Sequence, residues 1–129
     1  SKSLNKKGIT LLIEALNIID VPGFYLTGTD QAAQIISDAS ESNLKLQYDV
    51  YHMQIMEGDL LRTIVDNFNI IKHFQIADNP GRHEPGTGEI NYKNVFNKIN
   101  ELGYDGWIGC EYNPLGDTVE GLDWIGEQT

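Results

Sequence analysis

KHFQIADNPGRHEPGTGEINY, residues 72–92, passes from strand-like to loop-like character within a few positions. Its first part alternates apolar and polar residues, its middle is rich in glycine and proline, and a helical pattern begins at Tyr92. A strand that enters a long polar loop before a helix is a βα unit with an enlarged loop. Such loops concentrate binding and chemistry, so Arg82, His83 and Glu84 indicate a functional loop, with an ordinary surface connection as the alternative.

The same strand-then-helix order extends outward in both directions. Strands are predicted at about residues 9–16, 44–50, 72–77 and 106–112, the first buried on both faces. Helices are predicted from Thr29 or Asp30 to residue 40, at 59–70, at 92–102 and, briefly, at 119–125, with a loop at 51–58. This α/β alternation predicts a parallel sheet, either an open doubly wound sheet or part of a (β/α)8 barrel. No glycine-rich phosphate fingerprint follows a strand, which disfavours a nucleotide-binding open sheet.

Size and charge limit the classes of partner. The 129 residues suit one domain, and the net charge of −10 argues against nucleic acid or an anionic membrane as partner. The single cysteine, Cys110, excludes an intramolecular disulfide and suits a reducing compartment. No apolar run is long enough to span a membrane and the first residues are too polar for a signal peptide, so a cytoplasmic protein is expected.

Each predicted strand places one polar residue near its carboxyl end, on one face. These residues, expected at similar height on adjacent strands, are Glu14, Asp49, Gln75 and Glu111. Active sites of (β/α) barrels lie at that end. Three carboxylates converging there need a compensating cation, and oxygen ligands suit Mg²⁺ or Mn²⁺. Any one of them alone is more simply a satisfied polar residue at a strand end, but four at matching depth favour a metal site.

Five long segments resemble the hydroxypyruvate isomerase family, within the xylose isomerase-like barrel superfamily. They are LLIEALN, PGFYLTGTDQA, LKLQYDVYHMQIMEGDL, HFQIADNPGRHEPGTGEINY and GYDGWIGCEY. The resemblance implies a (β/α)8 fold, a divalent metal and interconversion of hydroxypyruvate with 2-hydroxy-3-oxopropanoate (tartronate semialdehyde). Relatives that isomerise 2-oxo-tetronates share much of the pattern, so the exact substrate stays open.

The resemblance also implies roles for six residues. Glu14 and Glu111 match the paired catalytic glutamates, which also touch the metal, and Asp49 and Gln75 match the other metal ligands. The positions that hold substrate oxygens match His52 and Arg82, for which a helix-entry hydrogen bond and a surface loop charge are the alternatives. An aldose–ketose-type shift through an enediolate needs a base, an acid and a positive centre, which these roles supply.

Four other residues are expected to be structural. Cys110 lies on the opposite strand face from Glu111 and is predicted to pack under a helix. Both Trp107 and Trp124 are expected to pack, and His73 to be a core residue or a support behind the site. His83 and Glu84 either reach the pocket or order the loop.

A complete barrel of this family is about twice as long, and residues 1–129 align with its second half as a single (β/α)4 domain. Such a half barrel would expose two sheet edges and an apolar inner face, which predicts a homodimer or larger homo-oligomer. The rival functions are a non-catalytic metal- or ligand-binding half-barrel remnant and an isomerase or epimerase of a larger sugar acid such as a 2-oxo-tetronate.

Overall fold

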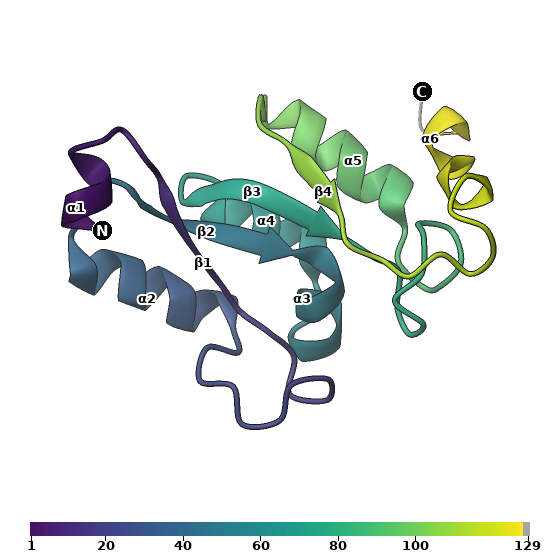
Figure 1. Ribbon diagram of the computed structural model, residues 1–129, viewed down its shortest axis with the longest axis horizontal. Helices are drawn as coiled ribbons and strands as arrows, with labels where there is room; N and C mark the ends of the chain where they lie inside the picture. Colours follow the sequence, from purple (N-terminus) through teal and green to yellow (C-terminus); the bar gives the residue numbers. More distant parts are fainter. Residues whose placement is uncertain (128–129) are drawn as a thin grey trace.

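A computed structural model describes residues 1–127 and contains one parallel sheet of four strands (Figure 1). The strands follow one another in space as in sequence: β1 (Leu11–Glu14), β2 (Leu44–Asp49), β3 (Ile71–Ile76) and β4 (Ile108–Cys110). All four predicted strands are present and shorter at some ends than expected. The sequence of βα units therefore gives the predicted α/β fold with parallel neighbours.

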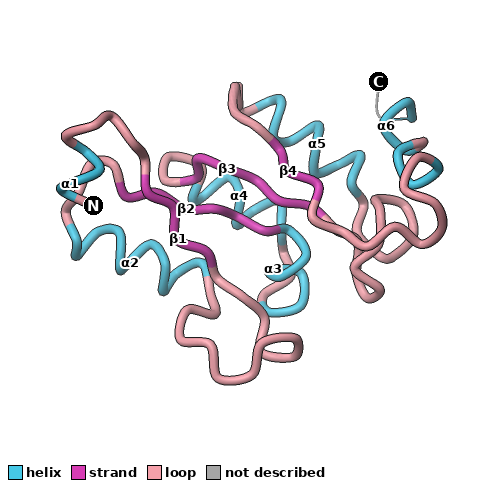
Figure 2. The backbone as a smooth tube through the Cα atoms, in the orientation of Figure 1, coloured by secondary structure: helices cyan, strands magenta, loops and turns pink. Residues whose placement is uncertain are grey.

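Helices fill the connections between strands (Figure 2). They are α2 (Thr29–Ala39), α3 (Val50–Met56), α4 (Leu60–Asn67) and α5 (Tyr92–Glu101). Outside these connections, the short helix α1 (Lys2–Asn5) precedes β1, and η1 (Glu120–Leu122) and α6 (Trp124–Glu127) follow β4. The prediction of a loop at 51–58 is wrong, because α3 begins directly after β2. The helix begins at this point because the Asp49 side chain accepts backbone N–H bonds from Tyr51 and His52 and so caps the helix.

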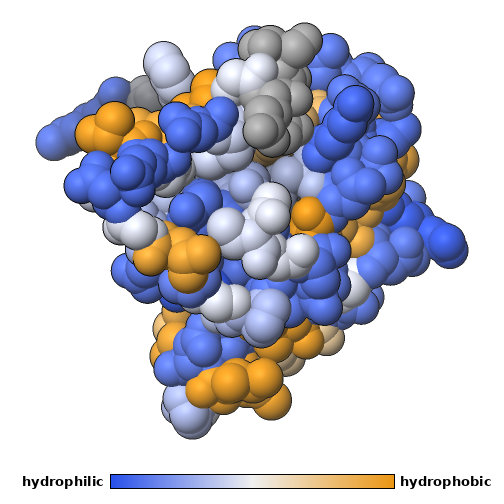
Figure 3. Space-filling model, turned by 90° about the vertical axis from the view of Figure 1, so that its right-hand side faces the viewer, coloured by the Kyte–Doolittle hydropathy of each residue, from blue (hydrophilic) through white to orange (hydrophobic). Residues whose placement is uncertain are grey.

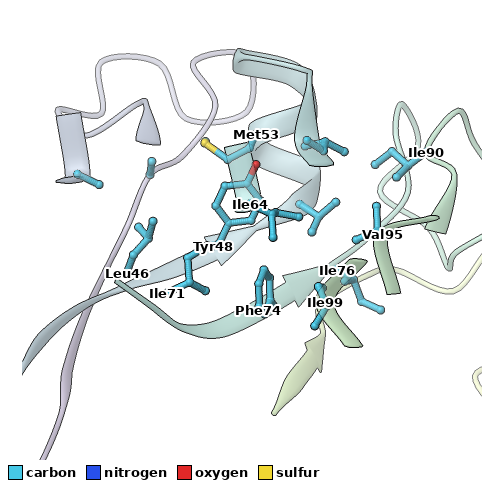
Figure 4. Close-up of a cluster of buried hydrophobic side chains, with 14 of the residues drawn as sticks. Leu46, Tyr48, Met53, Ile64, Ile71, Phe74, Ile76, Ile90, Val95 and Ile99 are labelled. Carbon is cyan, nitrogen blue, oxygen red and sulfur yellow. The ribbon is translucent and has the colours of Figure 1, made fainter. Parts of the chain in front are cut away.

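The core lies between the sheet and its helices (Figure 4). Leu46, Tyr48, Phe74 and Ile76 of β2 and β3 point to this side and are at most 1% exposed. Tyr48 and Phe74 meet edge to face, with ring centroids 6.0 Å apart. The helices contribute apolar partners that complete this layer: Met53, Ile64, Val95 and Ile99. The apolar half of each alternating strand is thus used against the helices.

The opposite face of the sheet is polar. Strand pairing aligns Glu14 with Gln47 and Gln47 with His73, and it aligns Asp49 with Gln75. The expected apolar inner face is therefore wrong, since the apolar alternates face the helices. The prediction that residues 9–16 are buried on both faces is also wrong: every residue of β1 is half-buried, because β1 is an end strand.

The pairing register is staggered between strands. Glu14 pairs with Gln47, two residues before Asp49, and Gln75 pairs with Gly109, two residues before Glu111. Strands of a (β/α)8 barrel tilt by about 36° to the axis, so residues at one height on the barrel are offset in register. The offsets between these residues are of the kind that such a tilt produces.

The two outer strand edges have no strand partner among residues 1–127, since β1 and β4 end the sheet. Near the β4 edge Trp107 is 85% exposed and Cys110 is exposed, so the expectation that both pack is wrong. The reason is that β4 is short and, among residues 1–127, has a neighbouring strand on one side only, β3. Trp124 does pack, stacked on Phe96 at 5.8 Å between ring centroids.

Other exposed apolar residues lie along the C-terminal segment, on the side of the molecule shown in Figure 3, where apolar patches are separated by polar surface. They include Leu115, Val119, Leu122 and Ile125. No helix within residues 1–127 combines the length and apolar character that crossing a bilayer requires.

Candidate metal and substrate site

The loop after β3 is folded around one buried carboxylate, that of Asp78. Its Oδ1 accepts backbone N–H bonds from Asn79 (2.9 Å) and Ile90 (3.0 Å), and its Oδ2 accepts them from Gly86 (2.9 Å) and Gly88 (3.0 Å). A Cβ on Gly88 would lie 2.1 Å from the Asn79 carbonyl oxygen, so this position requires glycine. The glycines and Asp78 together give the loop a fixed shape.

This loop brings Arg82 to the carboxyl end of β4. The Arg82 Nη2 atom donates to Glu111 Oε2 at 2.8 Å, and the guanidinium carbon lies 5.0 Å from the centroid of the Tyr51 ring. Two predicted site residues, Arg82 and Glu111, are therefore in direct contact. Arg82 is a paired, partly buried cation and not a free surface charge.

The neighbouring residues His83 and Glu84 order the loop. His83 Nδ1 lies 2.6 Å from the Asn113 carbonyl oxygen, and Glu84 Oε2 accepts the Leu115 backbone N–H at 2.9 Å. Both contacts join the loop to the segment after β4. Of the two alternatives for this pair, the hydrogen bonds support loop ordering.

Three predicted site residues come together beside the loop. Glu14, Asp49 and His52 each offer one ligand-type atom, and these atoms lie within 4.8 Å of one another. Asp49 is 1% exposed; its Oδ1 caps α3, and its Oδ2 lies 3.8 Å from His52 Nε2. This is the cluster among residues 1–127 whose geometry suits a metal ion, and it lies at the predicted end of the sheet.

Gln47 links this cluster to Gln75, another of the predicted metal ligands. Its Nε2 donates to Glu14 Oε2 at 2.8 Å and also to Gln75 Oε1. The other oxygen of Glu14, Oε1, is buried and has no hydrogen-bond partner among the described residues. Sequence reasoning placed Gln47 on the correct strand face but assigned it no role. The available signal for a role was its position next to two acidic strand ends, those at Glu14 and Asp49.

Burial makes this end of the sheet unfavourable for negative charge. It raises the pKa of Glu14 to about 7, helped by the charges of Asp49 and Glu111 and opposed by the Gln47 hydrogen bond. Burial likewise raises the pKa of Asp49 to about 6, opposed first by the backbone N–H of Tyr51. A bound cation would relieve both penalties.

The donor set fits a hard divalent ion. Carboxylate and amide oxygens are the ligands that Mg²⁺ and Mn²⁺ prefer, and the unpartnered Glu14 Oε1 is a buried oxygen that lacks a positive partner. The residues present therefore support a metal site at this position.

Asn17, a residue that sequence reasoning missed, contacts the Nδ1 side of the His52 ring, opposite the nitrogen that faces Asp49. The Asn17 backbone N–H donates to His52 Nδ1 at 3.0 Å, and Asn17 Nδ2 lies 2.7 Å from the same atom. Burial lowers the pKa of His52, which favours the neutral ring. Asp20 extends the network by accepting from Asn17 Nδ2 at 3.0 Å and from the Tyr51 hydroxyl at 2.8 Å. Asn17 and Asp20 lie just after the first predicted strand, and this position was the only sequence signal that they have a role in the site.

A parallel sheet with helices on one face and a carboxylate cluster at the strand ends is typical of a (β/α)-barrel protein whose strand-end carboxylates suit a metal ion. The chain belongs to the xylose isomerase-like TIM barrel family, whose family model matches residues 2–128.

Its relatives carry isomerase names. The chain is 55% identical over 122 residues to the hydroxypyruvate isomerase of Escherichia coli, covering 95% of this chain and 47% of that protein. It is 46% identical over 119 residues to the 2-oxo-tetronate isomerase of Cupriavidus necator, covering 92% and 46%. The chain therefore spans about half the length of these curated relatives.

A solved structure superposes closely on the chain. It is the crystal structure of an AP endonuclease, family 2, from Brucella melitensis, with a TM-score of 0.95 and 42% identity, covering 98% of this chain and 49% of that one. The family resemblance and the fold predicted from the sequence are thus confirmed.

The raised pKa of Glu14 predicts a pH-dependent stability difference for Glu14→Gln in metal-free protein. Between the unfolded pKa near 4.5 and the folded pKa of about 7, the folded state binds more protons than the unfolded state, so the free energy of unfolding of the parent falls as pH rises. Glu14→Gln removes this loss. Full conversion of the pKa shift would give about 3 kcal/mol, and solvent screening at this partly exposed side chain reduces that to roughly 1 kcal/mol. The stability of Glu14→Gln relative to the parent should therefore be higher by this amount above pH 7 than at pH 4.

Urea denaturation in a chelating buffer at both pH values measures this difference. Glu101→Gln, at an exposed glutamate of α5 far along the sequence from the cluster, is the matched control and should show no such trend. A stability difference between parent and Glu14→Gln that is the same at both pH values would contradict the account of Glu14.

Proposed function

We propose that this chain carries the acid–base and metal-binding part of an isomerase that interconverts hydroxypyruvate and 2-hydroxy-3-oxopropanoate (tartronate semialdehyde). The observation that carries the proposal is the buried, unpartnered Glu14 Oε1 beside Asp49, at the strand ends of a family barrel. The 55% identity to a hydroxypyruvate isomerase supports the substrate class. The reaction type is an aldose–ketose-type intramolecular oxidoreduction.

The residues proposed to hold Mg²⁺ or Mn²⁺ are Glu14, Asp49, Gln75 and Glu111. When bound, such an ion supplies Lewis-acid stabilisation of the negative charge that develops on a substrate oxygen. Two of these residues are already linked, since Gln47 donates to both Glu14 and Gln75. Glu111 is held by Arg82 at 2.8 Å and stands outside the three-residue cluster.

Proton transfer between the two substrate carbons is assigned to Glu14 and Glu111. One takes a proton from the carbon that bears the hydroxyl group, which leaves an enediolate, and the other delivers a proton to the neighbouring carbon. The hydroxyl proton passes to the former carbonyl oxygen, so the product has the same atoms and charge. A pKa of about 7 gives Glu14 substantial populations of both protonation states near neutral pH, as a group that takes and gives a proton requires.

Substrate binding is assigned to Arg82 and His52. Among the described residues, the Arg82 guanidinium has acceptors for Nη2 and, at 3.5 Å, for Nε, which leaves its other amino group for a substrate carboxylate. His52 is 2% exposed and its Nε2 faces the acidic cluster. This position supports the proposal that His52 contacts a substrate oxygen near the proposed metal.

A second candidate is isomerisation of a larger sugar acid. The 46% identity to a 2-oxo-tetronate isomerase favours it, because the same residues would serve the same proton shift on a longer chain. A metal-binding half barrel without turnover is the candidate from outside enzymes, since the chain spans about half of these relatives.

The activity is tested by following hydroxypyruvate by proton NMR in the presence of Mn²⁺ or Mg²⁺. Turnover is expected in the parent, and Glu14→Gln and Glu111→Gln should each lower it by about 10²-fold or more, because each removes a proton-transfer group. Glu101→Gln is the control and should leave turnover unchanged. Faster turnover of a 2-oxo-tetronate supports the second candidate, and no turnover of either substrate contradicts the catalytic proposal.

Self-association of the 129-residue chain is the second proposal. The outer edges of β1 and β4 have no partner strand within residues 1–127, and Trp107 beside β4 is 85% exposed. A second copy that pairs with these edges would bury them in a homodimer or a larger homo-oligomer. The acidic charge and the polar inner face favour paired assembly over unspecific aggregation.

Light scattering coupled to size-exclusion chromatography measures the assembly. We expect a dimer or larger species, and we expect Trp107→Gln to shift the population towards smaller species. The control is Tyr25→Gln, at an 80% exposed tyrosine in the loop between β1 and α2 that lies outside both edge strands, and it should give no such shift. A monodisperse monomer for the parent would contradict this proposal.

A further inference from the structure

The side-chain amide of Asn17 has a fixed orientation. Asn17 is fully buried, and its Oδ1 accepts the backbone N–H groups of Ile19 (3.0 Å) and Asp20 (2.8 Å). Its Nδ2 donates to Asp20 Oδ2 at 3.0 Å. Exchanging the oxygen and nitrogen would set an NH₂ group against two N–H groups and an oxygen against a carboxylate. The nitrogen therefore faces His52.

This orientation determines which nitrogen of His52 carries the proton. His52 Nδ1 lies 3.0 Å from the backbone nitrogen of Asn17 and 2.7 Å from its Nδ2. Both groups can only donate, so Nδ1 must present its lone pair. In a neutral imidazole the proton is then on Nε2.

Nε2 is the atom of His52 that faces the carboxylates. It lies 3.8 Å from Asp49 Oδ2, which is too far for a hydrogen bond and leaves its N–H for another acceptor. A protonated Nε2 has no lone pair, so it cannot ligate a metal ion. Although Glu14, Asp49 and His52 lie within 4.8 Å of one another, His52 is thereby excluded from the metal ligands.

We propose that Asn17 is a positioning residue that holds His52 in the Nε2–H tautomer, so that His52 donates to a substrate oxygen and does not bind the metal. The catalytic part of this inference rests on the proposed isomerase function; the tautomer itself does not. Asp20 supports the arrangement by binding Asn17 Nδ2 and the hydroxyl of Tyr51, the residue next to His52. The side chain just after β1 thus sets the chemistry of a side chain in α3.

Long-range ¹H–¹⁵N NMR of the histidine rings tests the tautomer directly. The chain has three histidines, so His52→Gln assigns the His52 signals. In the parent at neutral to alkaline pH we expect an unprotonated Nδ1 and a protonated Nε2. A protonated Nδ1 in the parent overturns the inference, and this measurement needs no variant of Asn17.

Asn17→Asp tests the cause. It replaces the donating NH₂ with an accepting oxygen of nearly the same shape and leaves the backbone N–H of residue 17 as the one remaining donor to Nδ1, so the share of His52 rings with a protonated Nδ1 should rise. The matched control is Asn43→Asp, which changes another buried asparagine whose Nδ2 donates to the Ile9 carbonyl at 2.9 Å, and which should leave the His52 pattern unchanged. A His52 tautomer distribution in folded Asn17→Asp that is the same as in the parent overturns the role of the Asn17 side chain.

Turnover gives the functional readout. Asn17→Asp should lower kcat/KM for hydroxypyruvate by about 10–100-fold, the range typical of residues that orient a functional side chain, and Asn43→Asp should not. A parent with the expected tautomer but no turnover would refute the proposed function alone. A parent with turnover and a protonated Nδ1 would refute the role of Asn17 alone.

Discussion

Burying carboxylates at the end of a parallel sheet is the constraint on which this structure depends. Strand alternation sends Glu14 and Asp49 to the face without helices, and burial raises the pKa of both. Nearby groups offset part of the charge: Gln47 binds Glu14, backbone N–H groups bind Asp49, and Arg82 binds Glu111. One buried oxygen of Glu14 remains without a partner among the described residues, and a bound cation would supply that partner.

The two faces of the sheet have different roles: one packs against the helices and the other carries the candidate site. The face towards the helices holds the apolar alternates, such as Tyr48 and Phe74, and its packing keeps the strands in place. The other face holds the polar alternates and ends in the site. Because each strand serves both faces, the stability of the core and the position of the carboxylates are set by the same register.

The sequence predicted those parts that follow from local pattern. Period-two alternation identified the strands and the shared face of Asp49 and Gln75, which the register confirms. Local pattern did not reveal α3, whose start depends on the Asp49 side chain turning back to its own backbone. Cys110 was misjudged because nothing local shows that β4 ends the sheet. Asn17 and Asp78 were missed because their partners are backbone and ring atoms that only the folded chain brings near.

The central claim is that the strand ends form one divalent-metal site, and calorimetric titration of metal-stripped protein with Mn²⁺ tests it most directly. The account predicts binding to one site per chain, which Asp49→Asn and Glu111→Gln each abolish or greatly weaken. Surface carboxylates of this acidic protein would instead give weak binding to several sites that the two substitutions leave unchanged. That result, or no binding at all, would contradict the claim.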